Sequence, residues 1–161
     1  MSKATGIPAQ AAADIGAWLD GHPETVSVQD VRGVPTHRRA GVDFVWRTQQ
    51  ATHTLQVIGD RWDDTGSFYF ETHGDGQLGN AGSFFYTEAQ YIFYYFVASG
   101  TLYILPMPET REWLKPRLET FLERCMTAPA ANGGHCLMAG RLVPIVAVLA
   151  AVPNVEEVQL E

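Results

Sequence analysis

Two short runs of sequence decide the fold class: Gly41-Val42-Asp43-Phe44-Val45-Trp46 and His53-Thr54-Leu55-Gln56-Val57-Ile58-Gly59. Both contain the β-branched and aromatic residues that are typical of strands. A short polar segment separates them, so residues 42–48 and 52–59 are predicted to pair as antiparallel strands. The pair places Asp43 on one strand and Gln56 and Ile58 on the next.

Helical and strand patterns interleave along the rest of the chain. Helices are predicted over residues 8–19, 108–126 (kinked at Pro116) and 144–151, with one helical turn at 87–90. Further strands are predicted over residues 25–31, 67–72, 91–97, 101–107 and 155–160, and loops over 33–41, 74–82 and 127–134. Such interleaving predicts the α/β or the α+β class; of the two we expect α/β, as a single domain over residues 1–161.

Composition is that of an ordinary globular domain: 161 residues, 46% hydrophobic and 18% charged. The formal net charge of −7 argues against broad attraction to a polyanion, although it leaves room for a local basic patch. Two cysteines, Cys125 and Cys136, are too few for a disulfide scaffold, so reduced thiols in a cytoplasmic protein are expected. No signal peptide is recognised, and the longest apolar run, residues 142–152, is too short for a membrane span.

Several short motifs follow the strand pair in a fixed order, at residues 57–61, 65–72, 85–91, 94–96 and 140–145. Together with the spacing of Asp43 and Gln56-Val57-Ile58, they resemble a phage and mobile-element branch of the PD-(D/E)xK nuclease-like superfamily. In that superfamily an Asp and a Glu/Asp-x-Lys on the next strand hold a divalent metal and activate water. The resemblance implies a restriction-endonuclease-like fold, a central mixed sheet flanked by helices.

The active-site positions of that motif are overwritten in this chain. Gln56 stands where the superfamily has an acid and Ile58 where it has lysine, so that Asp43 alone is kept. Holding Mg²⁺ or Mn²⁺ against water takes more than one carboxylate, and isoleucine cannot stabilise the negative charge that develops in phosphoryl transfer. Metal-dependent phosphodiester hydrolysis is therefore expected to be weakened or lost.

A first hypothesis keeps the nuclease activity at a relocated site. Asp43, Asp60 and Glu71 would bind Mg²⁺ or Mn²⁺, Gln56 would add an oxygen ligand, and His73 would act as the base. His73 follows Glu71 by two residues and shares its face if the strand continues. In the alternative, Asp60 caps a turn, Glu71 ends an edge strand and His73 faces solvent. Asp14, on the first predicted helix, is an additional candidate acid.

A second hypothesis is nucleic-acid binding without catalysis. Four arginines and a histidine flank the overwritten motif: Arg32, Arg38, Arg39 and Arg47, with His37. Such side chains can contact the phosphate backbone of DNA or RNA. In the alternative they are solubilising charges.

A third hypothesis is a protein-interaction module, either a homodimer or part of a larger assembly. A dense aromatic segment would bury one side of its strand and offer the other to a partner. Its members are Phe84, Phe85, Tyr91, Phe93, Tyr94, Tyr95 and Phe96. In the alternative, both sides of this strand are buried.

Overall fold

The computed structural model describes residues 6–73, 82–129 and 135–160, without the side chains of 126–138. The chain forms two compact units. Unit 1 comprises residues 1–65, 88–108 and 154–161, and unit 2 comprises residues 66–87 and 109–153. The single domain expected over residues 1–161 stays a prediction.

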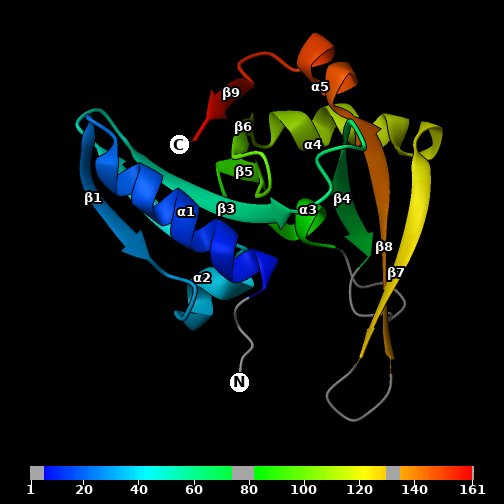
Figure 1. Cartoon of the computed structure of the whole chain (residues 1–161), viewed down its shortest axis with the longest axis horizontal. Helices are drawn as coiled ribbons and strands as arrows, with labels where there is room; N and C mark the ends of the chain where they lie inside the picture. The colour runs from blue at the N-terminus through cyan, green and yellow to red at the C-terminus, as the bar shows by residue number, and fades with distance from the viewer. Residues whose placement is uncertain (1–5, 74–81, 130–134, 161) are drawn as a thin grey trace. The chain divides into compact units, whose positions relative to one another are not determined.

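Unit 1 is built on a six-stranded mixed sheet with the order β1-β2-β3-β5-β6-β9 (Figure 1). Its strands are β1 (Thr25–Asp30), β2 (Phe44–Thr48), β3 (Thr52–Asp60), β5 (Tyr91–Phe96), β6 (Thr101–Pro106) and β9 (Glu156–Gln159). Neighbouring strands are antiparallel except β3 and β5, which are parallel. The predicted mixed sheet and the predicted pairing of residues 42–48 with 52–59 are therefore confirmed.

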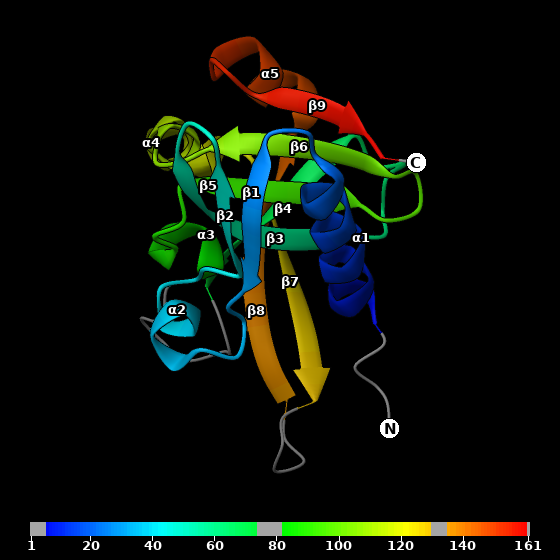
Figure 2. The same cartoon turned by 90° about the vertical axis from the view of Figure 1, so that its left-hand side faces the viewer.

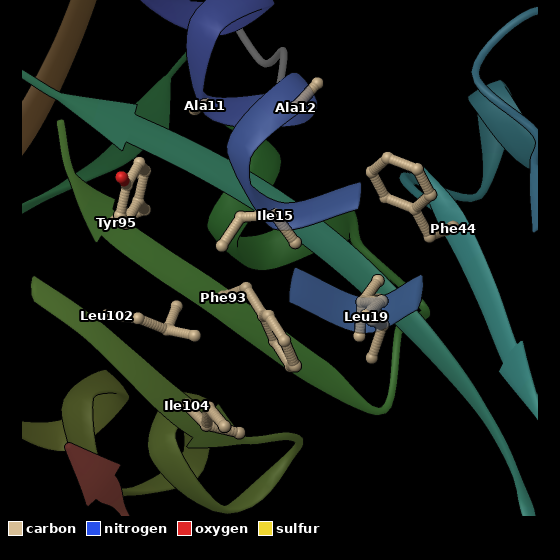
Figure 3. Packing of buried hydrophobic residues seen from close by; sticks show 10 residues of the cluster. Ala11, Ala12, Ile15, Leu19, Phe44, Phe93, Tyr95, Leu102 and Ile104 are labelled. Carbon is tan, nitrogen blue, oxygen red and sulfur yellow. The ribbon is translucent and has the colours of Figure 1, made fainter. Parts of the chain in front are cut away.

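Helix α1 (Ile7–Gly21) lies across β3 (Figures 1 and 2). A proline at its start and a run of alanines favour the helix, and Ile15 and Leu19 lie one turn apart on its buried side. These two residues pack against Phe44, Leu55 and Phe93 from three different strands (Figure 3). Burial of large apolar side chains of this kind contributes roughly 1.5–3 kcal/mol each.

Gly59 of β3 is the point of closest approach to the helix. A Cβ at this position would lie 2.7 Å from the Cβ of Ala11 and 3.1 Å from the carbonyl oxygen of Ile7. Because side chains alternate along a strand, Leu55, Val57 and Gly59 point toward α1. This side of the sheet is called the α1 face, and Gln56, Ile58 and Asp60 lie on the opposite face.

Unit 2 contains a three-stranded antiparallel sheet that the sequence did not predict as a separate sheet. Its order is β4 (Ser67–His73), β8 (His135–Pro144), β7 (Leu122–Pro129). The helices of this unit are α3 (Ser83–Tyr86), α4 (Glu109–Leu114), η2 (Lys115–Thr120, a 3₁₀ helix) and α5 (Ile145–Ala151). Phe70 stacks between Phe68 and Phe84, with ring centroids 5.4 and 4.3 Å away, and forms an aromatic core.

The predicted helix over residues 108–126 is wrong after its first two turns. The α-helix ends at Leu114, and the chain continues as a 3₁₀ helix containing Pro116 and then as β7. Proline lacks an N–H and disfavours α-helical geometry in the residue before it, which ends the helix here. β7 pairs with β8 from Leu122 to Pro129, so part of the expected loop at 127–134 is strand, and residues 130–134 lie outside the described residues.

Two smaller predictions also fail. Residues 33–41, expected as a loop, contain the short helix α2 (Pro35–Arg39), which starts with proline as helices often do. The helical turn expected at residues 87–90 is absent, and helix α3 ends before it. Gln90 instead pairs with Thr54, whose N–H donates to the Gln90 side chain over 3.0 Å. The expected loop at 74–82 falls largely on residues 74–81, outside the described ones.

Strand β5 is buried on both sides. Ile92, Phe93, Tyr94, Tyr95 and Phe96 are each at most 3% exposed. The alternative interpretation of this aromatic run is therefore confirmed, and the open aromatic face expected for a partner is wrong. No helix in the described part of the chain is both long and apolar enough to cross a membrane.

We expect Gly59→Ala to lower the free energy of unfolding by about 1–3 kcal/mol, because the added methyl group forces α1 away from β3. Chemical denaturation would measure the change. Gly33→Ala is the matched control, because a Cβ there meets nothing within 4 Å, and its effect should stay within about 0.5 kcal/mol. Equal changes in the free energy of unfolding for Gly59→Ala and Gly33→Ala would contradict the close approach of α1 to β3.

Candidate functional site

Asp43 immediately precedes β2 and is held by three hydrogen bonds. Its N–H donates to the carbonyl of Leu55 over 2.7 Å, and its carbonyl accepts the N–H of Val31 over 2.9 Å. Its carboxylate Oδ2 accepts the N–H of Val57 over 2.7 Å. The side chain of Asp43 therefore binds the backbone of β3 at the point where β2 begins. It lies beside the strand segment that carries Gln56 and Ile58.

Burial raises the pKa of the Asp43 carboxyl above its ordinary value of 3.8. The hydrogen bond from Val57 and the charge of Arg32 lower this pKa, while the charge of Asp30 raises it further, and burial prevails. The anionic form of Asp43 is thus less favourable here than in water.

Gln56 lies on the opposite face of the sheet from α1 and is only 8% exposed. Its Oε1 is buried and has no hydrogen-bond partner among the described residues. Buried polar atoms are normally paired, so this orphaned oxygen is an uncommon feature. Ile58, two residues further along the same face, stands opposite Tyr94 of β5 in the strand register.

Asp60 ends β3 and has partners of its own. Its Oδ1 accepts the N–H of Trp62 over 2.8 Å, which caps the turn after the strand, and its Oδ2 accepts the hydroxyl of Tyr94 over 2.6 Å. Gln56 and Asp60 are four residues apart, which is roughly 13 Å along a strand. Asp43 and Asp60 therefore belong to separate hydrogen-bond groups at different points of β3.

Glu71 and His73 belong to β4 in unit 2. The Oε1 of Glu71 accepts the N–H of Ser83 over 3.0 Å, at the start of α3. The Nδ1 of His73 lies 3.2 Å from the Oγ1 of Thr72. The register of β4 with β8 shifts between Glu71 and His73, so the simple alternation assumed for this pair is interrupted. Their place in a metal site with Asp43 and Asp60 stays a prediction.

The four arginines differ in their surroundings. Arg32 forms an ion pair with Asp30, with Nη2 2.5 Å from Oδ2, and its guanidinium lies 5.7 Å from the ring centre of Phe44. Arg38, Arg39 and Arg47 are exposed, and no described carboxylate lies within ion-pair distance of them. These three are the arginines available to a phosphate backbone.

Two tyrosines form hydrogen bonds with candidate acids, and neither was predicted from the sequence as a site residue. Tyr94 binds Asp60, and the hydroxyl of Tyr95 donates to Oδ2 of Asp14 over 2.8 Å on the α1 face. Burial, with a further contribution from Asp14, raises the pKa of Tyr95 to about 12. Adjacent residues on a strand point to opposite faces of the sheet. The sequence therefore indicated that Tyr94 and Tyr95 would contact different carboxylates.

Among the described side chains, no three His, Cys, Asp or Glu residues gather closely enough to hold a metal ion. The thiol of Cys125 is free and exposed, whereas the side chain of Cys136 lies outside the described ones. No protein-family model, curated protein or solved structure matches this chain. The likeness to the PD-(D/E)xK superfamily therefore rests on the motif positions themselves.

We expect Asp43→Asn to become more stable relative to the wild type as the pH rises. Above pH 3.8 the carboxyl of the unfolded chain ionises before the buried one, so the wild type loses stability until the folded group also ionises. Asparagine keeps an oxygen to accept the N–H of Val57. Urea denaturation between about pH 3 and about pH 7 measures the difference. Asp64→Asn removes a charge at an exposed position and is the control for the lost charge. The expectation is contradicted if the free energy of unfolding of the wild type rises relative to that of Asp43→Asn as the pH increases.

Proposed function

We propose that unit 1 is a restriction-endonuclease-like scaffold of the PD-(D/E)xK type, related to nucleic-acid processing, on which metal-dependent phosphodiester hydrolysis has been lost. The supporting observation is the hydrogen bond from the Val57 N–H to the Asp43 carboxylate. Val57 lies between Gln56 and Ile58, so this bond brings the three motif positions together in space. Only one of the three, Asp43, carries an ionisable group.

The residues at this place do not fit a resident Mg²⁺ or Mn²⁺. Hard divalent cations take carboxylate oxygens by preference, whereas the pair here is one acid with a raised pKa and one neutral amide, Gln56. Ile58 supplies no positive charge. Asp60 lies four residues beyond Gln56 on β3, roughly 13 Å away along the strand, so it does not complete a metal site at this place. Loss of hydrolysis therefore accounts for these observations better than a relocated metal site does.

The remaining link to nucleic acid rests on Arg38, Arg39 and Arg47. Because Arg32 is paired with Asp30, only three of these four arginines are left to contact phosphates. The formal net charge of −7 opposes the binding of a polyanion. Binding of DNA or RNA through these arginines would be weak, and the binding constant would fall as the salt concentration rises. On duplex DNA, the logarithm of the binding constant would fall against the logarithm of the salt concentration with a slope near −0.9 per neutralised phosphate. The alternative of an interaction module or homodimer lacks the aromatic face on which it was based.

Restoring the motif tests the proposal directly. We expect the wild type to cleave no labelled single-stranded, duplex or branched DNA or RNA in Mg²⁺ or Mn²⁺. The double variant Gln56→Glu with Ile58→Lys should gain EDTA-sensitive cleavage, because it regains a second carboxylate and a cation for the developing charge. Adding Asp43→Asn should remove the gain. Cleavage by the wild type that is lost in Asp43→Ala or Glu71→Ala would instead indicate an active nuclease with rearranged acids.

Metal binding offers a second measurement that does not depend on catalysis. In Gln56→Glu a second buried carboxylate lies near Asp43, so we expect the variant to be destabilised without metal and stabilised by Mn²⁺. Ligand at a hundredfold excess over its Kd adds about 2.7 kcal/mol to the free energy of unfolding. The control is Gln56→Glu combined with Asp43→Asn, which should respond much less. Identical Mn²⁺ responses of all variants and the wild type would overturn the motif correspondence.

A further inference from the structure

A pocket of about 280 Å³ lies on the α1 face of unit 1, next to the last turn of α1. Five of the eleven lining residues carry aromatic rings: Trp18, Trp46, His53, Tyr91 and Phe93. They come from α1, β2, β3 and β5. The site is separate from the Asp43 motif, because His53 and Gln56 point to opposite faces of β3.

The rings are tilted against one another rather than stacked flat. Trp46 lies 5.4 Å from His53 at 45° and 6.2 Å from Trp18 at 54°, measured between ring centroids. His53 in turn meets Tyr91 at 5.6 Å and 71°. Rings tilted in this way turn their faces in different directions, and all four line the same pocket.

Trp46 is held in place by a hydrogen-bond chain. Its indole N–H donates to Oγ1 of Thr25 over 2.7 Å, and that hydroxyl donates to the carbonyl of Leu19 over 2.6 Å. Since its only polar group is occupied, Trp46 presents a purely aromatic surface to the pocket. Figure 3 shows Phe93, another wall residue, beside Leu19 at the same end of α1. The aromatic wall is thus ordered before any ligand binds.

The charges at the pocket favour a cation. Two glutamates, Glu24 and Glu156, belong to the lining and are exposed, and no lysine or arginine does. Aromatic faces attract organic cations within about 6 Å of the ring centre. Anionic ligands such as nucleotides are disfavoured by the same groups.

The two glutamates stand toward opposite edges of the sheet. Glu24 directly precedes β1, and Glu156 begins β9, the two edge strands in the order β1-β2-β3-β5-β6-β9. The order from β1 to β9 covers five strand spacings, or about 24 Å, and both glutamate side chains reach from these edges into the pocket lining. An elongated ligand with a positive charge at each end matches this layout.

We propose that this pocket binds a linear aliphatic polyamine. The terminal ammonium groups meet Glu24 and Glu156, and the methylene chain with its inner charges lies over the rings of Trp18, Trp46 and Tyr91. This activity is independent of the nuclease-like motif, so either proposal can fail alone.

Calorimetric titration of the full chain with spermine, a long linear polyamine with an ammonium group at each end, tests the proposal. We expect saturable one-to-one binding, weaker binding of pentylamine, which has one charge, and none of neutral 1,5-pentanediol. Glu24→Gln and Glu156→Gln should each weaken spermine binding about two- to fivefold, as expected for exposed ion pairs. Trp46→Leu should weaken it about tenfold or more, because it removes both ring surface and the attraction of the ring for the cation.

Glu157→Gln is the matched control, because it removes one exposed charge from the next position of β9, where Glu157 lies beside Tyr103 outside the pocket lining. Its affinity should equal that of the wild type. Equal weakening by Glu156→Gln and Glu157→Gln would indicate unspecific charge attraction and overturn the proposal. Absence of saturable binding, or equal binding of 1,5-pentanediol, would also overturn it. Because the glutamates are exposed, their substitution leaves the core intact even if Trp46→Leu fails to fold.

Discussion

The close contact between Gly59 and Ala11 sets the arrangement of unit 1. A side chain at position 59 would collide with the helix, so β3 fits beneath α1 only when its odd-numbered residues face the helix. A slip of one residue would exchange the two faces of the strand. Leu55 would then leave the core, and Gln56 would enter it. The separation of an aromatic pocket on one face from the Asp43 motif on the other follows from this one register.

Asp43 has a structural role whether or not a metal binds to it. Its carboxylate accepts a backbone N–H of β3, and its own main chain bonds to Leu55 and Val31. An acid kept at this position is therefore not by itself a sign of catalysis. Gln56 differs, because its buried Oε1 has no partner in the described structure. An unpaired buried oxygen costs about 1–3 kcal/mol, which makes Gln56 the more informative residue of the motif.

Local patterns predicted the elements that depend on local sequence. Alternation and turn residues located β2 and β3, the hairpin of β5 and β6, and α1, whose apolar spacing is helical. The prediction failed where the local pattern favours another element. Residues 122–126 have a helical pattern but form part of β7, which pairs with the next strand, β8. The contacts of the site are instead distant in sequence, since those of Asp60 with Tyr94 and of Trp46 with Thr25 join residues that are 34 and 21 positions apart.

The alternation along β3 also bears on how such a protein diverges. Substitutions at Gln56 and Ile58 change side chains that do not touch the surface under α1, while those at Leu55 and Val57 do. Selection can therefore act on the two faces as nearly independent traits, with the helix-packed face maintaining the fold. If the chemistry of one face is no longer needed, residues on that face can be substituted without changing the residues on the other face.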